Sequence, residues 1–360
     1  MIPLHRVFMS SDIDKEEINK ILFSGKLTSG DNVRLFEKAL QDYIGNPYVM
    51  VTGSNNYASL IALALTGLGK DDEVIASPMA CLASNQPALN FQAKIVWADI
   101  DPLTGSLDPV DVKKKITAKT KVILHYHWCG YLGYIDAINQ IGKEYGITVI
   151  DDAIESFGSE YKDRKIGNLG TPITTFSFQT VRLPNSIDGG ALAFNTEGTY
   201  LEALKMRDFG IDRTTFRNSM GEISSKSNIV GIGYNAIMNE LNAYIGLQNM
   251  KAVPELLEKQ RENATDWHNK FEGQKTQKPL LPQSGTIPNY WVYSLLSDEQ
   301  NKAINEFKAK GLYASKVHLR NDYYSCFGGF DSDLKGVKEF EKKQYSIPSG
   351  WWVNKKEIAL

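Results

Sequence analysis

Three carboxylates close together in the chain are the first residues whose type and spacing could do chemistry. Asp151 and Asp152 directly follow the apolar run Val149-Ile150, and Glu155 lies three residues further on. Consecutive residues of a strand point to opposite faces, so one aspartate can enter a pocket while the other faces away. A carboxylate at a strand end can hold a proton or a cationic group, and it can equally cap the next helix. Both interpretations stay open from position alone.

Polar residues at three other places could bind a phosphate or transfer a proton. Ser54-Asn55-Asn56 opens an apolar helix-like segment. The free N–H groups of a helix N-terminus bind phosphate well, although these residue types are also the commonest plain N-caps. Phe176-Ser177-Phe178 followed by Asp188-Gly189-Gly190 predicts two strands and a loop, where the glycine pair permits close backbone approach. His127 follows a strand end, where a lone histidine is more often structural than catalytic.

The segments that must position these residues alternate between strand-like and helix-like patterns. Short apolar runs predict strands buried on both faces, and they lie at 74–75, 95–98, 122–125 and 147–150. Helices are expected at 11–25 with Ser11 as N-cap, at 57–68 and at 134–145. This succession predicts a mostly parallel sheet with helices on both faces, and ligands bind beyond the carboxyl ends of such strands.

The pattern changes after about residue 190. The stretch 207–227 is polar and predicts irregular structure, and 274–287 is rich in Lys, Gln, Pro and Gly and predicts a linker. Further elements are expected as helices at 239–250, 254–271 and 300–310, and as a strand at 291–295. We therefore predict a large α/β domain over residues 1–250 and a small α+β domain over residues 251–360.

Composition limits the possible classes of function. The 360 residues include 40 Lys and Arg against 42 Asp and Glu, so the net charge of −2 does not favour nucleic acid or an anionic membrane. No apolar run approaches the roughly 18–20 residues of a membrane span, and the N-terminus lacks the layout of a secretion signal. Cys81, Cys129 and Cys326 cannot all pair and form no metal-type cluster. We expect a cytoplasmic protein without a metal site.

Motifs spread over nearly the whole chain point further. They lie at 72–75, 93–101, 116–121, 151–153, 165–167, 176–178, 189–190, 210–213, 233–235, 243–248, 317–322 and 347–352. Together they resemble the DegT/DnrJ/StrS family of sugar aminotransferases, pyridoxal-phosphate enzymes of the aspartate-aminotransferase fold. The resemblance implies a large domain with a mostly parallel seven-stranded sheet between helices and a small C-terminal α+β domain. It also implies a nucleotide-sugar substrate, amino-sugar or surface-polysaccharide biosynthesis, and a homodimer.

The resemblance assigns cofactor-binding roles residue by residue. Asp152 matches the aspartate that pairs with the cofactor's pyridine nitrogen, where a carboxylate keeps the ring protonated as an electron sink. Glu155 falls where the family usually has Gln or His near the ring hydroxyl. Ser177 matches a phosphate-contacting serine, and Asn235 matches an asparagine that reaches the phosphate from the other subunit.

Other positions that the resemblance assigns depart from the family pattern. Ser54-Asn55-Asn56 falls on the Ser-Gly-Thr phosphate loop, with two of three residues changed. Cys81 occupies the normally aromatic position that faces the cofactor ring. In the small domain, His318 and Arg320 lie where substrate could approach, although a surface ion pair explains Arg320 equally well.

The largest departure is at the lysine that forms the Schiff base with the cofactor. The family places this lysine five residues after Ser177, and this chain has Arg182 there. A guanidinium stays protonated with a pKa above about 12, so it cannot form the Schiff base and is a poor proton carrier. No lysine lies between Thr171 and Asn195. We therefore expect pyridoxal phosphate or pyridoxamine phosphate, if either is bound, to be held without a covalent bond.

Three interpretations of Arg182 remain open. In the first, the protein is a working sugar aminotransferase, and either Arg182 is an engineered change or another group supplies the base. In the second, it is a sugar dehydratase that uses non-covalent pyridoxamine phosphate, with His127 or Tyr126 moving protons. In the third, it is a non-catalytic nucleotide-sugar-binding or regulatory subunit without cofactor, in which Arg182 anchors an anion.

Overall fold

The computed structural model describes residues 1–28, 30–331 and 333–359. Its centre is a seven-stranded sheet of order β1-β9-β8-β5-β4-β2-β3. These strands are β1 (Val49–Thr52), β9 (Gly190–Phe194), β8 (Ile173–Ser177), β5 (Thr148–Asp152), β4 (Thr120–Tyr126), β2 (Glu73–Ala76) and β3 (Lys94–Trp97). Only β9 runs antiparallel to its two neighbours, and the other pairings are parallel. The expected mostly parallel seven-stranded sheet is confirmed.

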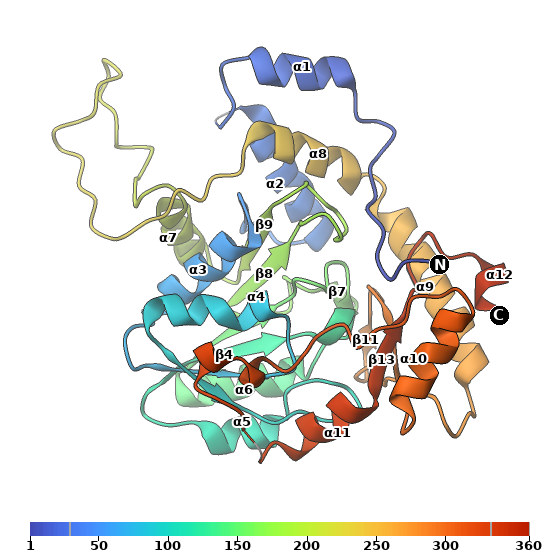
Figure 1. Cartoon of the computed structure of the whole chain (residues 1–360). Helices are drawn as coiled ribbons and strands as arrows, with labels where there is room; N and C mark the ends of the chain where they lie inside the picture. Colours follow the sequence, from blue (N-terminus) through green and yellow to red (C-terminus); the bar gives the residue numbers. More distant parts are fainter. Residues whose placement is uncertain (29, 332, 360) are drawn as a thin grey trace.

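Helices cover both faces of this sheet (Figure 1). One face, called the site-side face below, packs against α3 (Asn55–Leu65), whose Ala58, Ile61 and Ala62 belong to the same buried cluster as Val122 and Ile150 of the strands. The opposite face packs against α2 (Asp31–Ile44) and α8 (Glu240–Met250) at one end of the sheet. At the other end it packs against α5 (Pro109–Lys115) and α6 (Ile135–Tyr145).

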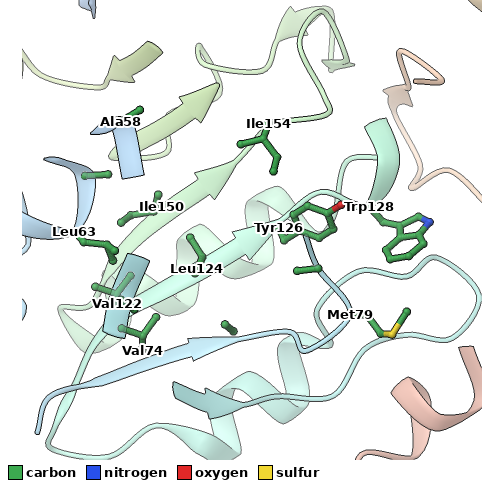
Figure 2. Close-up of a cluster of buried hydrophobic side chains, with 14 of the residues drawn as sticks. Ala58, Leu63, Val74, Met79, Val122, Leu124, Tyr126, Trp128, Ile150 and Ile154 are labelled. Atoms are coloured by element: carbon green, nitrogen blue, oxygen red, sulfur yellow. The ribbon is translucent and has the colours of Figure 1, made fainter. Parts of the chain in front are cut away.

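The apolar core of the site-side face leads directly to the carboxyl ends of the strands. Figure 2 shows Val122, Leu124 and Tyr126 along β4, with Trp128 beyond its end. In the same cluster, Ile154 follows β5. Because alternate residues of β4 share one face, the row that builds the core also aims Tyr126 towards the site.

The C-terminal part has its own core. A three-stranded antiparallel sheet of order β10-β12-β13 is formed by β10 (Lys278–Pro279), β12 (Tyr293–Leu296) and β13 (Gln344–Ile347). Its helices are α9 (Val253–Phe271), α10 (Gln300–Ala309), α11 (Lys335–Lys343) and α12 (Lys355–Ile358). Ile2 pairs with Leu312 in this part, so the chain's first residues lie on the C-terminal unit (Figure 1). The division at residue 250 stays a prediction.

Several local expectations need correction. The first helix, α1 (Lys15–Phe23), begins after Asp14, whose side chain accepts the N–H of Glu16, and not after Ser11. The segment expected to be a linker contains two short strands, β10 and β11 (Thr286–Ile287). β10 pairs with β12, and β11 pairs with β6 (Glu160–Tyr161). β6 also pairs with β7 (Arg164–Lys165). The short helix α4 (Leu82–Asn85) follows Cys81.

An extended arm joins α7 (Glu197–Arg207) to α8. Residues 208–239 of this arm contain isolated bridges but no helix and no strand of the described chain, and irregular structure was expected for 207–227. Figure 1 shows the arm projecting away from the sheet and its helices. No helix of the described residues is long and apolar enough to cross a membrane.

Candidate functional site

The candidate site lies at the carboxyl ends of β4, β5 and β8. Tyr126, Asp152 and Ser177 end these three strands and share the face that packs against α3. Asp151 points to the other face, so the strand alternation assigns Asp152, and not its neighbour, to the site. Glu155 follows three residues later, and its side chain is completely buried.

Glu155 is the centre of a hydrogen-bonded cluster. Its Oε1 accepts a hydrogen bond from Nη2 of Arg182 at 3.1 Å and lies 3.0 Å from Nε2 of His318. Its Oε2 accepts the hydroxyl of Tyr126. Burial alone would raise the pKa of Glu155, but His318 and Arg182 together hold it at about 2. The carboxylate is therefore ionised at neutral pH and engaged through both oxygens.

Arg182 points at Glu155 and packs against an indole. Its guanidinium lies 4.1 Å from the ring centroid of Trp291, a distance typical of a cation–π contact. The side chain is only 11% exposed, and its Nε and Nη1 are buried without a hydrogen-bond partner among the described residues. The cavity that Arg182, Glu155, Ser177 and Trp291 help to line holds about 10 Å³, room for about one water molecule.

The N-terminal segment covers the other side of this cluster. His5 stacks on Trp291 with ring centroids 4.1 Å apart and an interplanar angle of 14°. Burial and the nearby Arg182 lower the pKa of His5 to about 4, so this imidazole is neutral at pH 7. The indole N–H of Trp291 donates to the carbonyl of Val181 at 3.1 Å, which ties the stack to the loop that carries Arg182.

His318 is placed by an unusual turn. Val317 has a φ of 62°, and the N–H of His318 donates to the carbonyl of Lys316 at 2.7 Å. A γ-turn with a β-branched residue at positive φ is strained and rare, and such strain concentrates at functional sites. The imidazole meets the rings of Tyr126 and Trp128 edge-on, at 6.2 and 5.7 Å between centroids. These contacts fix the imidazole against Glu155.

The residues expected around the cofactor ring lie next to this cluster. Burial raises the pKa of Asp152 to about 6, against the opposing effects of the Ser84 hydroxyl and the N–H of Ile154. A cationic partner such as a protonated pyridine nitrogen would relieve this burial cost. Burial, together with the charge of Glu155, raises the pKa of Cys81 to about 11, so its thiol is neutral.

The residues expected to bind the phosphate of the cofactor lie at the start of α3. Ser54 caps this helix by accepting the N–H of Tyr57 at 3.4 Å, and Oδ1 of Asn55 is buried without a partner among the described residues. A Cβ at Gly190 would lie 2.8 Å from the backbone of Asn55, so only glycine lets β9 approach this turn so closely. Asn56 is exposed, and Asn235 is exposed on the arm of its own chain, paired with Asp208.

The chemistry of these residues fits the ring and the phosphate of pyridoxal or pyridoxamine phosphate. Asp152 meets the ring nitrogen's need for a carboxylate, and the N-terminus of α3 with Ser177 offers donors to a phosphate. Ser177 is buried at the end of β8, and the nearest polar contact of its hydroxyl is the N–H of Gln179 at 3.5 Å. At the position where the resemblance implies a Schiff-base lysine, this chain has the guanidinium of Arg182, which cannot form one.

His127 lies outside this cluster. It points to the opposite face with His125 and Asp151, and all three side chains are completely buried. Nδ1 of His127 accepts the N–H of Gly133 at 3.1 Å, so the proton of the neutral ring must be on Nε2, which lies 3.3 Å from Asp151. A protonated Nε2 cannot ligate a metal. The geometry gives His127 a structural role, and we do not retain it as a proton carrier.

Arg320 forms a buried ion pair. Only 1% of its side chain is exposed, and it forms two hydrogen bonds with the carboxylate of Asp322 and stacks on Phe330 at 4.4 Å. The expected surface ion pair is therefore a buried one. Trp291 and His5 belong to the cluster but were not expected there, and no local pattern could have indicated them, since each lies far from Glu155 in the sequence.

Comparisons with known proteins show the family. The model of the DegT/DnrJ/EryC1/StrS aminotransferase family matches residues 10–350. The spore coat polysaccharide biosynthesis protein SpsC of Bacillus subtilis is 27% identical over 354 residues, covering 93% of this chain and 90% of that protein.

Solved structures give the same fold. The sugar aminotransferase CalS13 from Micromonospora echinospora is 27% identical with a TM-score of 0.92, covering 100% of this chain and 97% of that one. AtS13 from Actinomadura melliaura is 29% identical with a TM-score of 0.92, covering 100% and 96%. The expected fold is confirmed, and because the family model spans most of its length, the chain belongs to the DegT/DnrJ/EryC1/StrS aminotransferase family.

Proposed function

We propose that this chain binds pyridoxal phosphate or pyridoxamine phosphate without a covalent bond and acts on a keto-sugar nucleotide in the cytoplasm. The observation that supports this proposal most strongly is the pairing of Arg182 with Glu155 at the position of the expected Schiff-base lysine. Asp152 and the start of α3 still provide the carboxylate and the N–H groups that the ring and the phosphate of the cofactor need. Family membership supports the aminotransferase class. Similarity to a spore coat polysaccharide biosynthesis protein, SpsC, and to a sugar aminotransferase, CalS13, supports a sugar substrate and polysaccharide biosynthesis.

Each residue of the site has a task in this proposal. The bound cofactor supplies a ring that accepts electrons from the reacting carbon. The carboxylate of Asp152 holds the ring proton, and the N–H groups at the start of α3 hold the phosphate. Burial and the charge of Glu155 raise the pKa of Tyr126 well above its ordinary value, so its phenol stays protonated and keeps donating to Glu155.

Proton transfer falls to His318 in this proposal. Arg182 keeps its protons, and His127 lies on the far face, so neither can replace the lysine. His318 belongs to the cluster, and the carboxylate of Glu155 orients its imidazole. Such an arrangement suits general acid–base catalysis. This favours one second candidate within the family, a dehydratase that uses pyridoxamine phosphate, because that reaction requires a base but no Schiff-base lysine.

A homodimer is part of the proposal. The arm between α7 and α8 exposes Met220, Val230 and Ile232 by 79%, 84% and 83%. Apolar side chains this exposed on one projecting segment are typical of a surface that another chain covers. Asn235 lies on the same arm, so the second copy would bring it towards the phosphate end of the first, as the resemblance implies.

Absorbance spectroscopy tests the proposal. The purified chain is mixed with pyridoxal phosphate or pyridoxamine phosphate, passed over gel filtration, and scanned beyond the protein's own ultraviolet band. The proposal is supported if the cofactor absorbance is retained and treatment with borohydride does not link the cofactor covalently to the chain. The products formed from keto-sugar nucleotides then distinguish transamination from dehydration. If neither form is retained, the proposal fails, and nucleotide-sugar binding without cofactor becomes the function to measure.

A further inference from the structure

We infer that Glu155, together with Arg182, controls covalent attachment of the cofactor, so that a lysine at position 182 would attach pyridoxal phosphate at least about 10-fold more slowly while Glu155 remains. This inference rests on the proposed cofactor site and goes beyond it, since it assigns to residue 155 a positioning role that the lysine position alone does not reveal. The two residues lie 27 positions apart in the chain and meet only in the folded protein.

The geometry makes the pair a single unit. Glu155 is completely buried and Arg182 is only 11% exposed, so water screens little of the attraction between their charges across 3.1 Å. The contact with Trp291 covers the guanidinium, and His318 and Tyr126 also contact the oxygens of the carboxylate. An ionised carboxylate in such surroundings needs a cation close by, because an isolated buried charge is costly.

A lysine at position 182 would lie close to the carboxylate of Glu155. An opposite charge within about 4–6 Å favours the charged form of a group by about 1–3 pKa units. The ammonium form would therefore be stabilised, and the fraction of neutral amine would fall by about 10- to 1,000-fold. Only the neutral amine has the lone pair that attacks an aldehyde, so attachment would be suppressed by about the same factor.

The attachment step itself is simple to trap. The neutral amine attacks the aldehyde carbon of pyridoxal phosphate, a C–N bond forms, and the carbonyl oxygen leaves as water. Borohydride then delivers hydride to that carbon and solvent supplies a proton to the nitrogen, which leaves a stable secondary amine on the chain. The mass of the intact protein reports the fraction of chains so modified, without any need for a substrate.

The experiment compares four forms of the full chain: wild type, Arg182→Lys, Arg182→Lys/Glu155→Gln and Arg182→Lys/Glu155→His. The two double variants carry the residues usual in the family at position 155, so the test survives if one of them does not fold. Arg182→Lys/Glu37→Gln is the matched control, since Glu37 is the carboxylate of a different partly buried arginine pair, with Arg207. Each protein is incubated with pyridoxal phosphate, sampled over time, and reduced.

At least one double variant should form the reduced adduct at least about 10-fold faster than Arg182→Lys, and the Glu37 control should behave like Arg182→Lys. Equal rates in Arg182→Lys and both double variants would overturn the inference. Retention of pyridoxal phosphate on gel filtration is measured in parallel. If no form retains or attaches the cofactor, the proposed cofactor site is wrong, and that outcome is distinct from retention with equal attachment rates.

Discussion

Replacing Glu155 by Gln removes one charge from the cluster while keeping the size of the side chain. The folded protein holds the pKa of this carboxyl at about 2, against an ordinary value of 4.5. A difference of this size corresponds to about 3 kcal/mol of stability at neutral pH. Breaking a buried ion pair by removing one partner costs about 3–5 kcal/mol, which agrees. Glu155→Gln should therefore destabilise the chain by about 3–5 kcal/mol.

Thermal unfolding, followed by circular dichroism, measures this loss. With an unfolding entropy of about 2.1 cal/mol/K per residue, a 360-residue chain should lose about 4–7 °C in Tm. The pH dependence has a definite sign. Because the folded-state pKa of Glu155 is depressed, its stabilisation is fully present above about pH 4.5 and is lost as the pH falls towards 2. The difference between wild type and variant should shrink over that range.

A double variant separates the ion pair from the loss of Glu155 alone. Glu155→Gln/Arg182→Met leaves no unpaired charge between these positions, so it should recover much of the lost stability. Double-mutant coupling between the two positions should exceed about 1 kcal/mol. The reasoning is refuted if Glu155→Gln costs less than about 1 kcal/mol at pH 7, or if the effects of the two substitutions simply add.

Three further predictions concern other residues. Because burial raises the pKa of Asp152 to about 6, above 3.8, the wild-type chain should lose stability as the pH rises through this range. Asp152→Asn should then stabilise the cofactor-free chain at pH 8 by up to about 3 kcal/mol in urea titrations. The same variant should retain less pyridoxamine phosphate on gel filtration. An unchanged free energy of unfolding would count against a buried charge at Asp152. Ile232→Asp on the arm should convert dimer to monomer in light scattering with the Tm of the monomer fold retained, and a persisting dimer would show that the arm is not the interface. His127→Gln should cost about 1–3 kcal/mol of stability and leave cofactor retention unchanged, whereas lost retention in a fully stable variant would place His127 in the site.

The sequence predicts the sheet better than the helices outside it. Strands buried on both faces appear as short apolar runs, and β2, β4 and β5 lie where those runs predict them. The helices α2 and α7 were not predicted, although α2 has buried residues at helical spacing, namely Val33, Phe36, Leu40 and Ile44. Their apolar positions are separated by charged residues, so no continuous apolar segment indicates them.

The site is predictable only where a residue's place depends on its own strand. Strand alternation limits the site to one of two neighbouring aspartates, and the register of β5 then selects Asp152. The partners of Glu155 come from β4, from the loop after β8 and from the segment after Leu312 in the C-terminal part. Contacts between such distant segments leave no local pattern in the chain. The sequence therefore predicts the individual residues but not the cluster that they form.

The pairing of Arg182 with Glu155 bears on whether the arginine belongs to this chain. The sequence resemblance implies Gln or His at position 155 and lysine at position 182. This chain has Glu155 and Arg182 at these positions, and the structure brings the two side chains within 3.1 Å. An isolated change of lysine to arginine, with Gln or His still at position 155, would leave a buried guanidinium without a carboxylate, at a cost of several kcal/mol. Here the carboxylate is present, and Trp291 covers the guanidinium. We therefore favour the interpretation in which Arg182 is native, because a single replacement made to trap a complex would not supply the matching carboxylate.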